Sequence, residues 1–485
     1  MTTIEAKTIS GAVRGSLANG VARFLGIPYA AAPFGANRFR PAQPHAGWSG
    51  VRDALELGAT APAPPYPKGF RDVLPEPVIA GEEILNLNVW APEGVTGAPV
   101  MVWIHGGAFV NGSNAVPVYD GTAFARDGVV LVSINYRLGA EGFLTLPDGP
   151  ANLGLLDQVA ALTWVRDNIA AFGGDPDQVT IFGESAGAMS VGTLLAMPAA
   201  EGLFHRAILQ SGAAHHAYSL ETAGKITSLI AEQVGMAPAE LAQVAPERLV
   251  RAHAELLTEM RNAPDPARFG EAASTLLIYV PVVDGETLPG RPLDLIAAGS
   301  ARGVDVLIGT THDEVHLFTV AGGMTEFLTD EVVDGLVGAM GLPDGAADRY
   351  RAARPGGAPW ETLSDAMTDQ IFRIPAIRLA EAHGRAWMYE FDWAVPALGG
   401  QLGACHAAEI GFVFDSLAAA VRMNGPDAPQ ELADAMHGAW VAFAGTGDPG
   451  WERYGDARNV RTFGTSTATV TDPRGDTREL WTGVR

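Results

Sequence analysis

A five-residue turn at positions 183–187 constrains the fold of this chain more than any other stretch of its sequence. The letters GESAG fit the pattern G-x-S-x-G. The turn follows a β-rich run at 178–182 (QVTIF) and precedes an alanine- and methionine-rich segment at 185–196 that favours a helix. In this strand–turn–helix context the serine sits in a strained conformation, and only glycine leaves room two residues to either side. We therefore predict that Ser185 is an exposed nucleophile at the positive end of a helix.

Strand-like and helix-like segments alternate through the first half of the chain. This rhythm is typical of a mostly parallel sheet with helices on both faces, so we expect an α/β fold with a large central sheet. The pattern at 8–30 predicts a small antiparallel meander, and an alanine-rich stretch at about 217–275 predicts a helical insertion that forms a cap. We see no repeat and no linker, and expect one domain over 1–485. The expected strands are 99–105, 128–136, 178–182, 206–210, 304–309 and 385–392, and the expected long helices are 152–171 and 429–444.

A second glycine-rich turn, IHGGAF at 104–109, also follows a predicted strand. A backbone that approaches a substrate carbonyl oxygen closely needs small residues, and loops of this type supply N–H groups to an oxyanion hole. We predict that the N–H groups of Gly107, Ala108 and Ala186 are the donors. His105 lies too early in the chain for the base of this fold, and we expect it to support the loop.

In α/β folds whose nucleophilic serine lies in a G-x-S-x-G turn, an acid and then a histidine follow the serine along the chain. The strand predicted at 304–309 leads into a loop that contains two neighbouring acids, Asp313 and Glu314. The histidines beyond this loop are His316, His383, His406 and His437. His406 follows a glycine-rich loop just after a strand, whereas the other three fall in segments that favour helices. We therefore predict that His406 is the general base.

The sequence as a whole resembles the type-B carboxylesterase family, and bacterial para-nitrobenzyl esterases in particular. The resemblance covers nearly the whole chain and rests on five stretches. They are 26–33 (GIPYAAAP) with Arg38 and Phe39, 82–90 (EEILNLNVW), 104–109 (IHGGAF), 135–142 (NYRLGAEG), and 152–187, which ends in FGGDPDQVTIFGESAG.

The resemblance implies the α/β-hydrolase fold and hydrolysis of small to medium carboxylic esters through an acyl-enzyme, without a cofactor or metal ion. It places the acid at Glu314, and it matches the family pattern H-x-x-E to His406 and the three residues that follow. Two positions depart from the family. Ile84 stands where a cysteine is common, and Val315 stands where glycine usually follows the acid.

The net charge and the single cysteine indicate which partners and which cell compartment to expect. The formal net charge of -23 disfavours binding to nucleic acid or anionic membranes, so we expect a small-molecule ester as the partner. Cys405 is the single cysteine, which excludes an intrachain disulfide and favours a cytoplasmic protein. Residues 1–11 lack the pattern of a signal peptide, and no run of about 18 apolar residues predicts a membrane helix. We expect a monomer or a homodimer.

Several alternatives remain at this stage. The same triad serves amidases and carbamate hydrolases, and the same fold serves as a catalytically inactive binding module. His312 and His316 have a spacing that two zinc ligands on one helix face would have, although the pattern is not H-E-x-x-H. For the substrate pockets we predict Phe109, Met189 and Phe318, with Val110 and Leu317 beside them.

Overall fold

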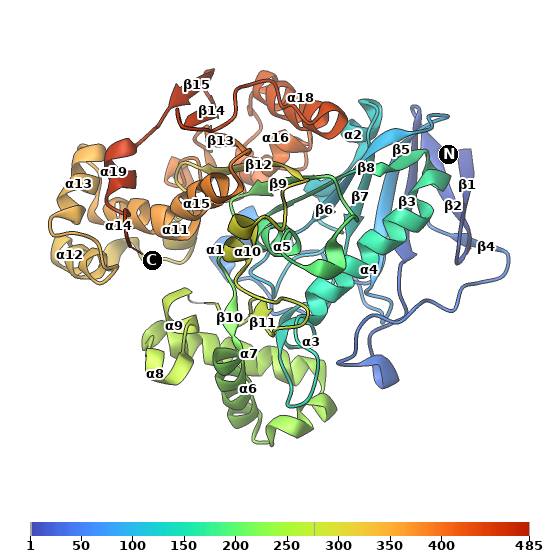
Figure 1. Ribbon diagram of the computed structural model, residues 1–485, viewed down its shortest axis with the longest axis horizontal. Helices are drawn as coiled ribbons and strands as arrows, with labels where there is room; N and C mark the ends of the chain where they lie inside the picture. Colours follow the sequence, from blue (N-terminus) through green and yellow to red (C-terminus); the bar gives the residue numbers. More distant parts are fainter. Residues whose placement is uncertain (1, 276, 485) are drawn as a thin grey trace.

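A computed structural model describes residues 2–275 and 277–484 (Figure 1). Its main feature is a sheet that contains 13 strands among these described residues. In spatial order the strands are β1 (Thr2–Thr8), β2 (Gly11–Ala18), β3 (Val21–Pro28), β5 (Asn86–Pro92), β7 (Val130–Ile134), β6 (Ala98–Ile104), β8 (Gly174–Glu184), β9 (Arg206–Gln210), β12 (Asp305–Thr311), β13 (Trp387–Asp392), β14 (Asn459–Gly464) and β15 (Thr467–Thr471), with β4 (Val51–Asp53) beside β2.

The middle of the sheet is parallel and its edges are antiparallel. Strands β7, β6, β8, β9, β12, β13 and β14 run parallel to one another, whereas β1, β2, β3 and β5 form an antiparallel edge and β15 closes the other edge. The predicted meander at 8–30 is therefore present, and it begins earlier, at Thr2. Parallel strands place their carboxyl ends along one edge, which is where loops can gather a site.

Helices cover both faces of the sheet, and alternate residues of the central strands face two separate cores. In β6, Val100, Val102 and Ile104 pack in one core, whereas Met101 and Trp103 pack in the other. All five are fully buried, which explains why this strand reads as a continuous apolar run. One face carries α4 (Leu153–Asn168), α5 (Ala186–Leu194), α10 (Pro292–Ala298) and α15 (Ile374–His383), and the other carries α2 (Thr122–Arg126), α16 (Ile410–Val413) and α18 (Gln430–Thr446).

The predicted helical insertion stands outside the sheet, in green at the bottom of Figure 1. It consists of α6 (Leu220–Val234), α7 (Pro246–Asn262), α8 (Pro266–Phe269) and α9 (Ala272–Thr275), and it begins after the short strand β10 (Tyr218–Ser219), which pairs with β11 (Val282–Val283). Helix α7 packs against α3 (Gly139–Phe143). That the whole chain is one domain with this insertion stays a prediction.

A second group of helices lies at the left of Figure 1, beyond β12. It includes α11 (His316–Ala321), α12 (Asp330–Gly338), α13 (Ala346–Ala353), α14 (Pro359–Thr368) and a π-helix, η7 (Asp369–Arg373). Helix α1 (Lys68–Val73) packs on α11, and the remaining short α-helices of the described residues are α17 (Val421–Asn424) and α19 (Gly475–Glu479). No helix in the described ranges combines the length and the apolar character needed to cross a bilayer.

A buried ion pair fixes α4 to the loop after β7. The Arg137 guanidinium donates from Nε and Nη2 to the two carboxylate oxygens of Asp157, each at 2.7 Å. The exposed fractions of the two side chains are 1% and 0%. Because the pair is bidentate and excluded from water, removal of one partner leaves an uncompensated buried charge.

We therefore expect Asp157→Ala to lower the free energy of unfolding by about 3–5 kcal/mol. Asp167→Ala is the matched control, because Asp167 lies on the same helix and pairs with Arg166 at the surface. That change should lower the free energy of unfolding by less than about 1 kcal/mol. Urea unfolding followed by circular dichroism measures both, and equal losses in the two variants would contradict a structural role for the buried pair.

Candidate active site

Ser185 occupies a strained turn between β8 and α5. Its φ of 56° and ψ of -124° lie outside the regions that residues with a side chain usually adopt. The turn is held from both sides, because the Ser185 N–H donates to the Gln210 carbonyl and the Ser185 carbonyl accepts from the Met189 N–H, each at 2.9 Å. Ser185 as a residue is partly exposed at the end of the sheet.

The two glycines of the turn are required because the backbone passes directly over β6. A Cβ atom added to Gly187 would lie 2.0 Å from the Ile104 carbonyl oxygen, and one added to Gly183 would lie 2.6 Å from the same oxygen. Neither contact is possible for a real side chain, so the G-x-S-x-G pattern follows from how closely β6 and the turn approach each other.

The glycine loop after β6 lies against the serine. A Cβ atom added to Gly106 would lie 3.0 Å from the Ser185 Cβ. Gly107 and Ala108 both have positive φ, 117° and 54°, and among the residues that the structure describes their N–H groups donate to no carbonyl or side chain. Ala186 is the first residue of α5, where the N–H has no partner within the helix. Among the described residues none of these three N–H groups has an acceptor, and all three lie on the two segments that meet at Ser185.

His105 supports this loop. Its ring stacks on Tyr136 with 4.6 Å between centroids, and its Nδ1 lies 2.9 Å from the Gly106 carbonyl oxygen. Burial lowers the pKa of His105 to about 4, so the ring is neutral at neutral pH. The supporting position predicted for His105 agrees with these contacts.

His406 is buried and lies between two carboxylates. Its Nδ1 is 2.6 Å from Glu314 Oε2, and its Nε2 is 3.0 Å from Glu184 Oε1. The second oxygen of Glu314 accepts a hydrogen bond from the Thr311 N–H at 2.8 Å. Burial alone lowers the pKa of His406, but the charges of Glu184 and Glu314 outweigh burial and hold that pKa well above its ordinary value.

The serine hydroxyl and the histidine are not hydrogen-bonded in the part of the chain that the structure describes. The ring nitrogen that would take the serine proton, Nε2, faces Glu184 instead. Catalytic hydrogen bonds in enzymes without substrate are often long and tighten only when substrate binds. The structure therefore brings His406 together with Glu314 directly, and with Ser185 through its neighbour Glu184.

Glu409, three residues after His406, is a third buried carboxyl group. Its Oε1 accepts from Gln210 Nε2 at 3.1 Å, and Gln210 Oε1 accepts from Trp440 Nε1 at 3.0 Å. Burial, with the nearby charges of Glu184 and Glu314, raises the pKa of Glu409 to about 8, so this group is mostly neutral at neutral pH. The sequence carried a signal for it, because Glu409 is the acid of the pattern H-x-x-E that begins at His406.

Aromatic side chains surround the histidine ring. The rings of Phe318, on α11, and Phe372, on η7, lie 5.2 Å and 4.9 Å from it between centroids. Phe70 of α1 lies 6.1 Å from Phe318. Phe318 was predicted from the sequence, whereas Phe70 and Phe372 carried no motif that could have identified them.

The other predicted pocket residues are more deeply buried. Phe109 is fully buried with its ring 4.8 Å from that of Phe143, and Met189 is buried on α5. Their predicted contact with substrate stays a prediction.

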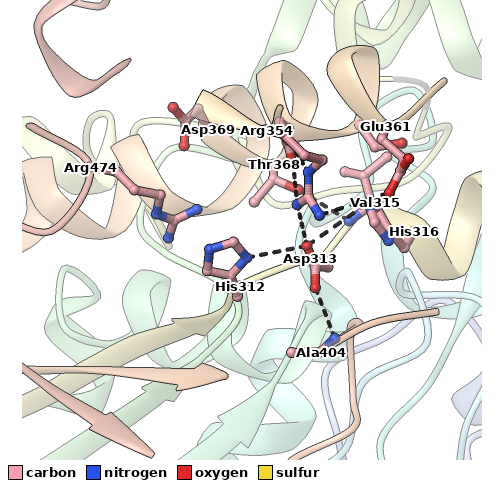
Figure 2. Close-up of polar contacts among 12 residues, drawn as sticks. His312, Asp313, Val315, His316, Arg354, Glu361, Thr368, Asp369, Ala404 and Arg474 are labelled. Atoms are coloured by element: carbon pink, nitrogen blue, oxygen red, sulfur yellow. Dashed lines mark hydrogen bonds and ion pairs between the residues drawn. The ribbon is translucent and has the colours of Figure 1, made fainter. Parts of the chain in front are cut away.

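The other candidates for the base and the acid make different contacts. His383 Nε2 lies 3.0 Å from the Val304 carbonyl oxygen and His437 Nδ1 lies 2.8 Å from the Val413 carbonyl oxygen, so both rings contact backbone carbonyl groups. Cys405 is buried. The Asp313 carboxylate contacts Arg354 and His312 (Figure 2).

One group of side chains has the composition of a metal site. Ligand atoms of Asp313, His316 and Asp365 lie within 4.8 Å of one another. The guanidinium of Arg354 already binds both carboxylates of this group. A cation thus lies where a metal ion would have to bind.

Comparison with known proteins agrees with this architecture. The profile of the carboxylesterase family matches residues 2–470. The chain is 39% identical over 461 residues to a para-nitrobenzyl esterase of Bacillus subtilis (strain 168), covering 91% of this chain and 90% of the relative. It is 38% identical to a phenmedipham hydrolase of Pseudarthrobacter oxydans, covering 92% of this chain and 90% of that relative.

Solved structures give the same result. A PNB esterase superposes with a TM-score of 0.85 at 36% identity over 99% of both chains. A carboxylesterase of Geobacillus stearothermophilus also gives 0.85, at 39% identity over 98% of this chain and 99% of the other. The predicted α/β-hydrolase fold is therefore confirmed.

The position of His406 between Glu184 and Glu314 leads to a test by titration. We expect Glu184→Gln to lower the pKa of His406, because the change removes one of the two carboxylates that stabilise the charged ring, while Glu314 and the neutral Glu409 stay in place. The imidazole resonances of His406, followed by NMR against pH, measure this. Glu141→Gln is the control, since Glu141 is a buried carboxylate that pairs with Arg38. An unmoved His406 titration in Glu184→Gln would contradict the expected contact.

Proposed function

The chain belongs to the carboxylesterase family and is a carboxylic ester hydrolase, and on this premise we propose that Ser185 is its nucleophile, His406 its general base and Glu314 the acid that orients the base. The observation that carries the proposal is the hydrogen bond of 2.6 Å between His406 Nδ1 and Glu314 Oε2, formed next to the strained serine turn. That bond fixes the tautomer in which Nε2 can accept a proton.

The reaction begins with attack on the ester carbonyl carbon. In its neutral form, which carries its proton on Nδ1, His406 takes the hydroxyl proton at Nε2 as the Ser185 Oγ forms a bond to that carbon. The carbonyl oxygen becomes an oxyanion, which the N–H groups of Gly107, Ala108 and Ala186 bind. One such donor is worth about 3 kcal/mol of transition-state stabilisation.

Collapse of this intermediate breaks the bond to the leaving alcohol. His406 returns its proton to the alcohol oxygen, and the acyl group stays on Ser185. Water then attacks the acyl-enzyme with His406 again as base, which releases the carboxylic acid and restores the hydroxyl. Glu314 stabilises the imidazolium in both halves, and Glu184 supplies a second negative charge next to the ring.

The substrates that we propose are small to medium carboxylic esters, bound next to the aromatic side chains around His406. Phe318 has the most direct support, because its ring lies beside that of His406. Met189 and Phe109 come from the two segments that carry the proposed oxyanion donors, and we propose that they shape the pocket behind them. Two relatives of this chain are a para-nitrobenzyl esterase and a phenmedipham hydrolase, and both names describe hydrolases.

Location and assembly also stay proposals. A cytoplasmic location is supported by the single cysteine, Cys405, and by Ile84 in place of a common family cysteine. For assembly we propose a monomer or a homodimer. Fractionation of the producing cells tests the location, and light scattering on the purified protein distinguishes the two assembly states.

For the nucleophile, we expect Ser185→Ala to lower kcat for para-nitrophenyl acetate by at least about 10⁴-fold, because the covalent intermediate can no longer form. Ser190→Ala, on the same helix, should keep an activity close to that of the unchanged protein, since its hydroxyl accepts a hydrogen bond from Gln158 of α4. Release of nitrophenol is the measurement. Ester hydrolysis that survives in folded Ser185→Ala would reject the proposed mechanism.

For substrate binding, we expect Phe318→Ala to raise KM for phenyl butyrate by at least about 10-fold, since a buried phenyl contact contributes about 1.5–3 kcal/mol. KM for methyl butyrate should change much less, because that ester has no ring to place against Phe318. Phe327→Ala is the control, as this phenylalanine is 76% exposed shortly after α11. Equal changes in KM for the two esters would show that Phe318 does not contact the alcohol group.

A further inference from the structure

Asp313 ties together the two loops that carry the proposed acid and base. Its backbone N–H donates to the Ala404 carbonyl oxygen at 2.9 Å, and its Oδ2 accepts from the Ala404 N–H, also at 2.9 Å. Asp313 comes immediately before Glu314, and Ala404 comes two residues before His406. The same pair of loops has one more backbone contact, in which the His406 N–H donates to the Glu314 carbonyl oxygen at 3.4 Å.

The carboxylate of Asp313 therefore accepts the hydrogen bond that a backbone carbonyl of a neighbouring strand would accept in a sheet. In a sheet a backbone carbonyl would accept from the Ala404 N–H, whereas here a side chain from the opposite loop does so. Gly403 makes the approach possible, since it has a φ of 58° and a Cβ added to it would lie 2.3 Å from Asp313 Oδ2. A larger residue at position 403 would push the carboxylate out of this position.

A second set of contacts holds the other oxygen of the same carboxylate. Figure 2 shows Asp313 Oδ1 between the His312 ring, whose Nδ1 lies 3.1 Å away, and the guanidinium of Arg354, which donates from Nη2. Arg354 follows α13 and is itself held by two hydrogen bonds to Asp365 of α14, each at 2.8 Å. The Asp313 side chain is only 10% exposed, so these contacts form away from bulk water.

The charges around Asp313 keep it ionised. Burial by itself raises the pKa of Asp313, but His312, His316 and Arg354 together hold that pKa well below its usual value. His316 Nε2 contributes from 3.9 Å, too far for a hydrogen bond. A charged carboxylate accepts hydrogen bonds more strongly than a neutral one, which strengthens the bond to the Ala404 N–H.

From these contacts we infer that Asp313, held in place by Arg354, is a positioning residue that sets the distance between Glu314 and His406 by clamping loop 403–406 to loop 312–315. The inference rests on the proposed function, because it assigns Asp313 a purpose only if Glu314 and His406 act as acid and base. Asp313 itself does not touch the reacting atoms. A displacement of about 1 Å in a catalytic group can lower a rate by about 10²-fold.

The test compares four variants in the full chain, each checked for folding by circular dichroism. Asp313→Ala removes the clamp. Asp313→Asn keeps the size, but its amide can satisfy only one of Ala404 and Arg354. Arg354→Gln removes the outer support. Arg351→Gln is the matched control, because Arg351 lies on α13 and pairs with Asp334 and Asp348 away from the clamp.

Three measurements separate positioning from general stability. They are kcat per active site, with sites counted by the nitrophenol burst, the KM for the same ester, and the downfield proton resonance of the His406 Nδ1–H. We expect Asp313→Ala to lower kcat about 10²-fold with KM changed less than about twofold, and to shift or broaden the imidazole resonance. Asp313→Asn and Arg354→Gln should each lower kcat about 10-fold, and Arg351→Gln should match the unchanged protein.

The inference is overturned if folded Asp313→Ala keeps the kcat and the imidazole resonance of the unchanged protein. Should that variant fail to fold, the same result in the isosteric Asp313→Asn overturns it. Ser185→Ala, assayed alongside, separates the two proposals. If that variant stays active, the proposed function fails, whereas a loss of activity there combined with an unaffected Asp313→Asn rejects the clamp alone.

Discussion

The close approach of β6 to the turn after β8 is the constraint on which the rest of the site depends. Because the Ile104 carbonyl oxygen lies where side chains of residues 183 and 187 would begin, the backbone can pass only with glycine at both positions. This contact sets Ser185 at the end of the sheet and, through Gly106, brings the glycine loop against it. The strain at Ser185 persists because a hydrogen bond to Gln210 at the end of β9 and another to Met189 of α5 hold the turn.

The charge around His406 depends partly on the serine turn, because the turn includes Glu184. Glu184 precedes the serine, so the same turn that exposes Ser185 also places a carboxylate beside the imidazole. With Glu314 on the other nitrogen, a ring that burial would keep neutral is stabilised in its charged form. In the proposed mechanism His406 becomes an imidazolium in each half of the reaction, and the two carboxylates would stabilise that charge.

The sequence predicted those parts of the site that are local. The serine turn and the glycine loop each lie within about six residues, and their steric requirements are visible in the glycines themselves. The choice between Asp313 and Glu314 was different, because residues alone left both open and the family resemblance favoured Glu314. In the structure the two side chains diverge, one toward Ala404 and the other toward His406, about ninety residues further along the chain.

Two other features were not predicted from the sequence. Phe372 was missed because the π-helix that directs its ring has no sequence signature that we could recognise. The strand order, with β7 between β5 and β6, depends on pairing between distant segments, which periodicity does not encode.

The division of β6 between two cores has an evolutionary consequence. Val102 and Trp103 are neighbours in sequence, yet they pack with different sets of side chains on opposite faces of the sheet. Substitutions on one face should therefore couple energetically with others on that face and combine additively with those on the other. Each half of the interior can then accumulate compensating changes independently, while the strand between them keeps the serine turn in place.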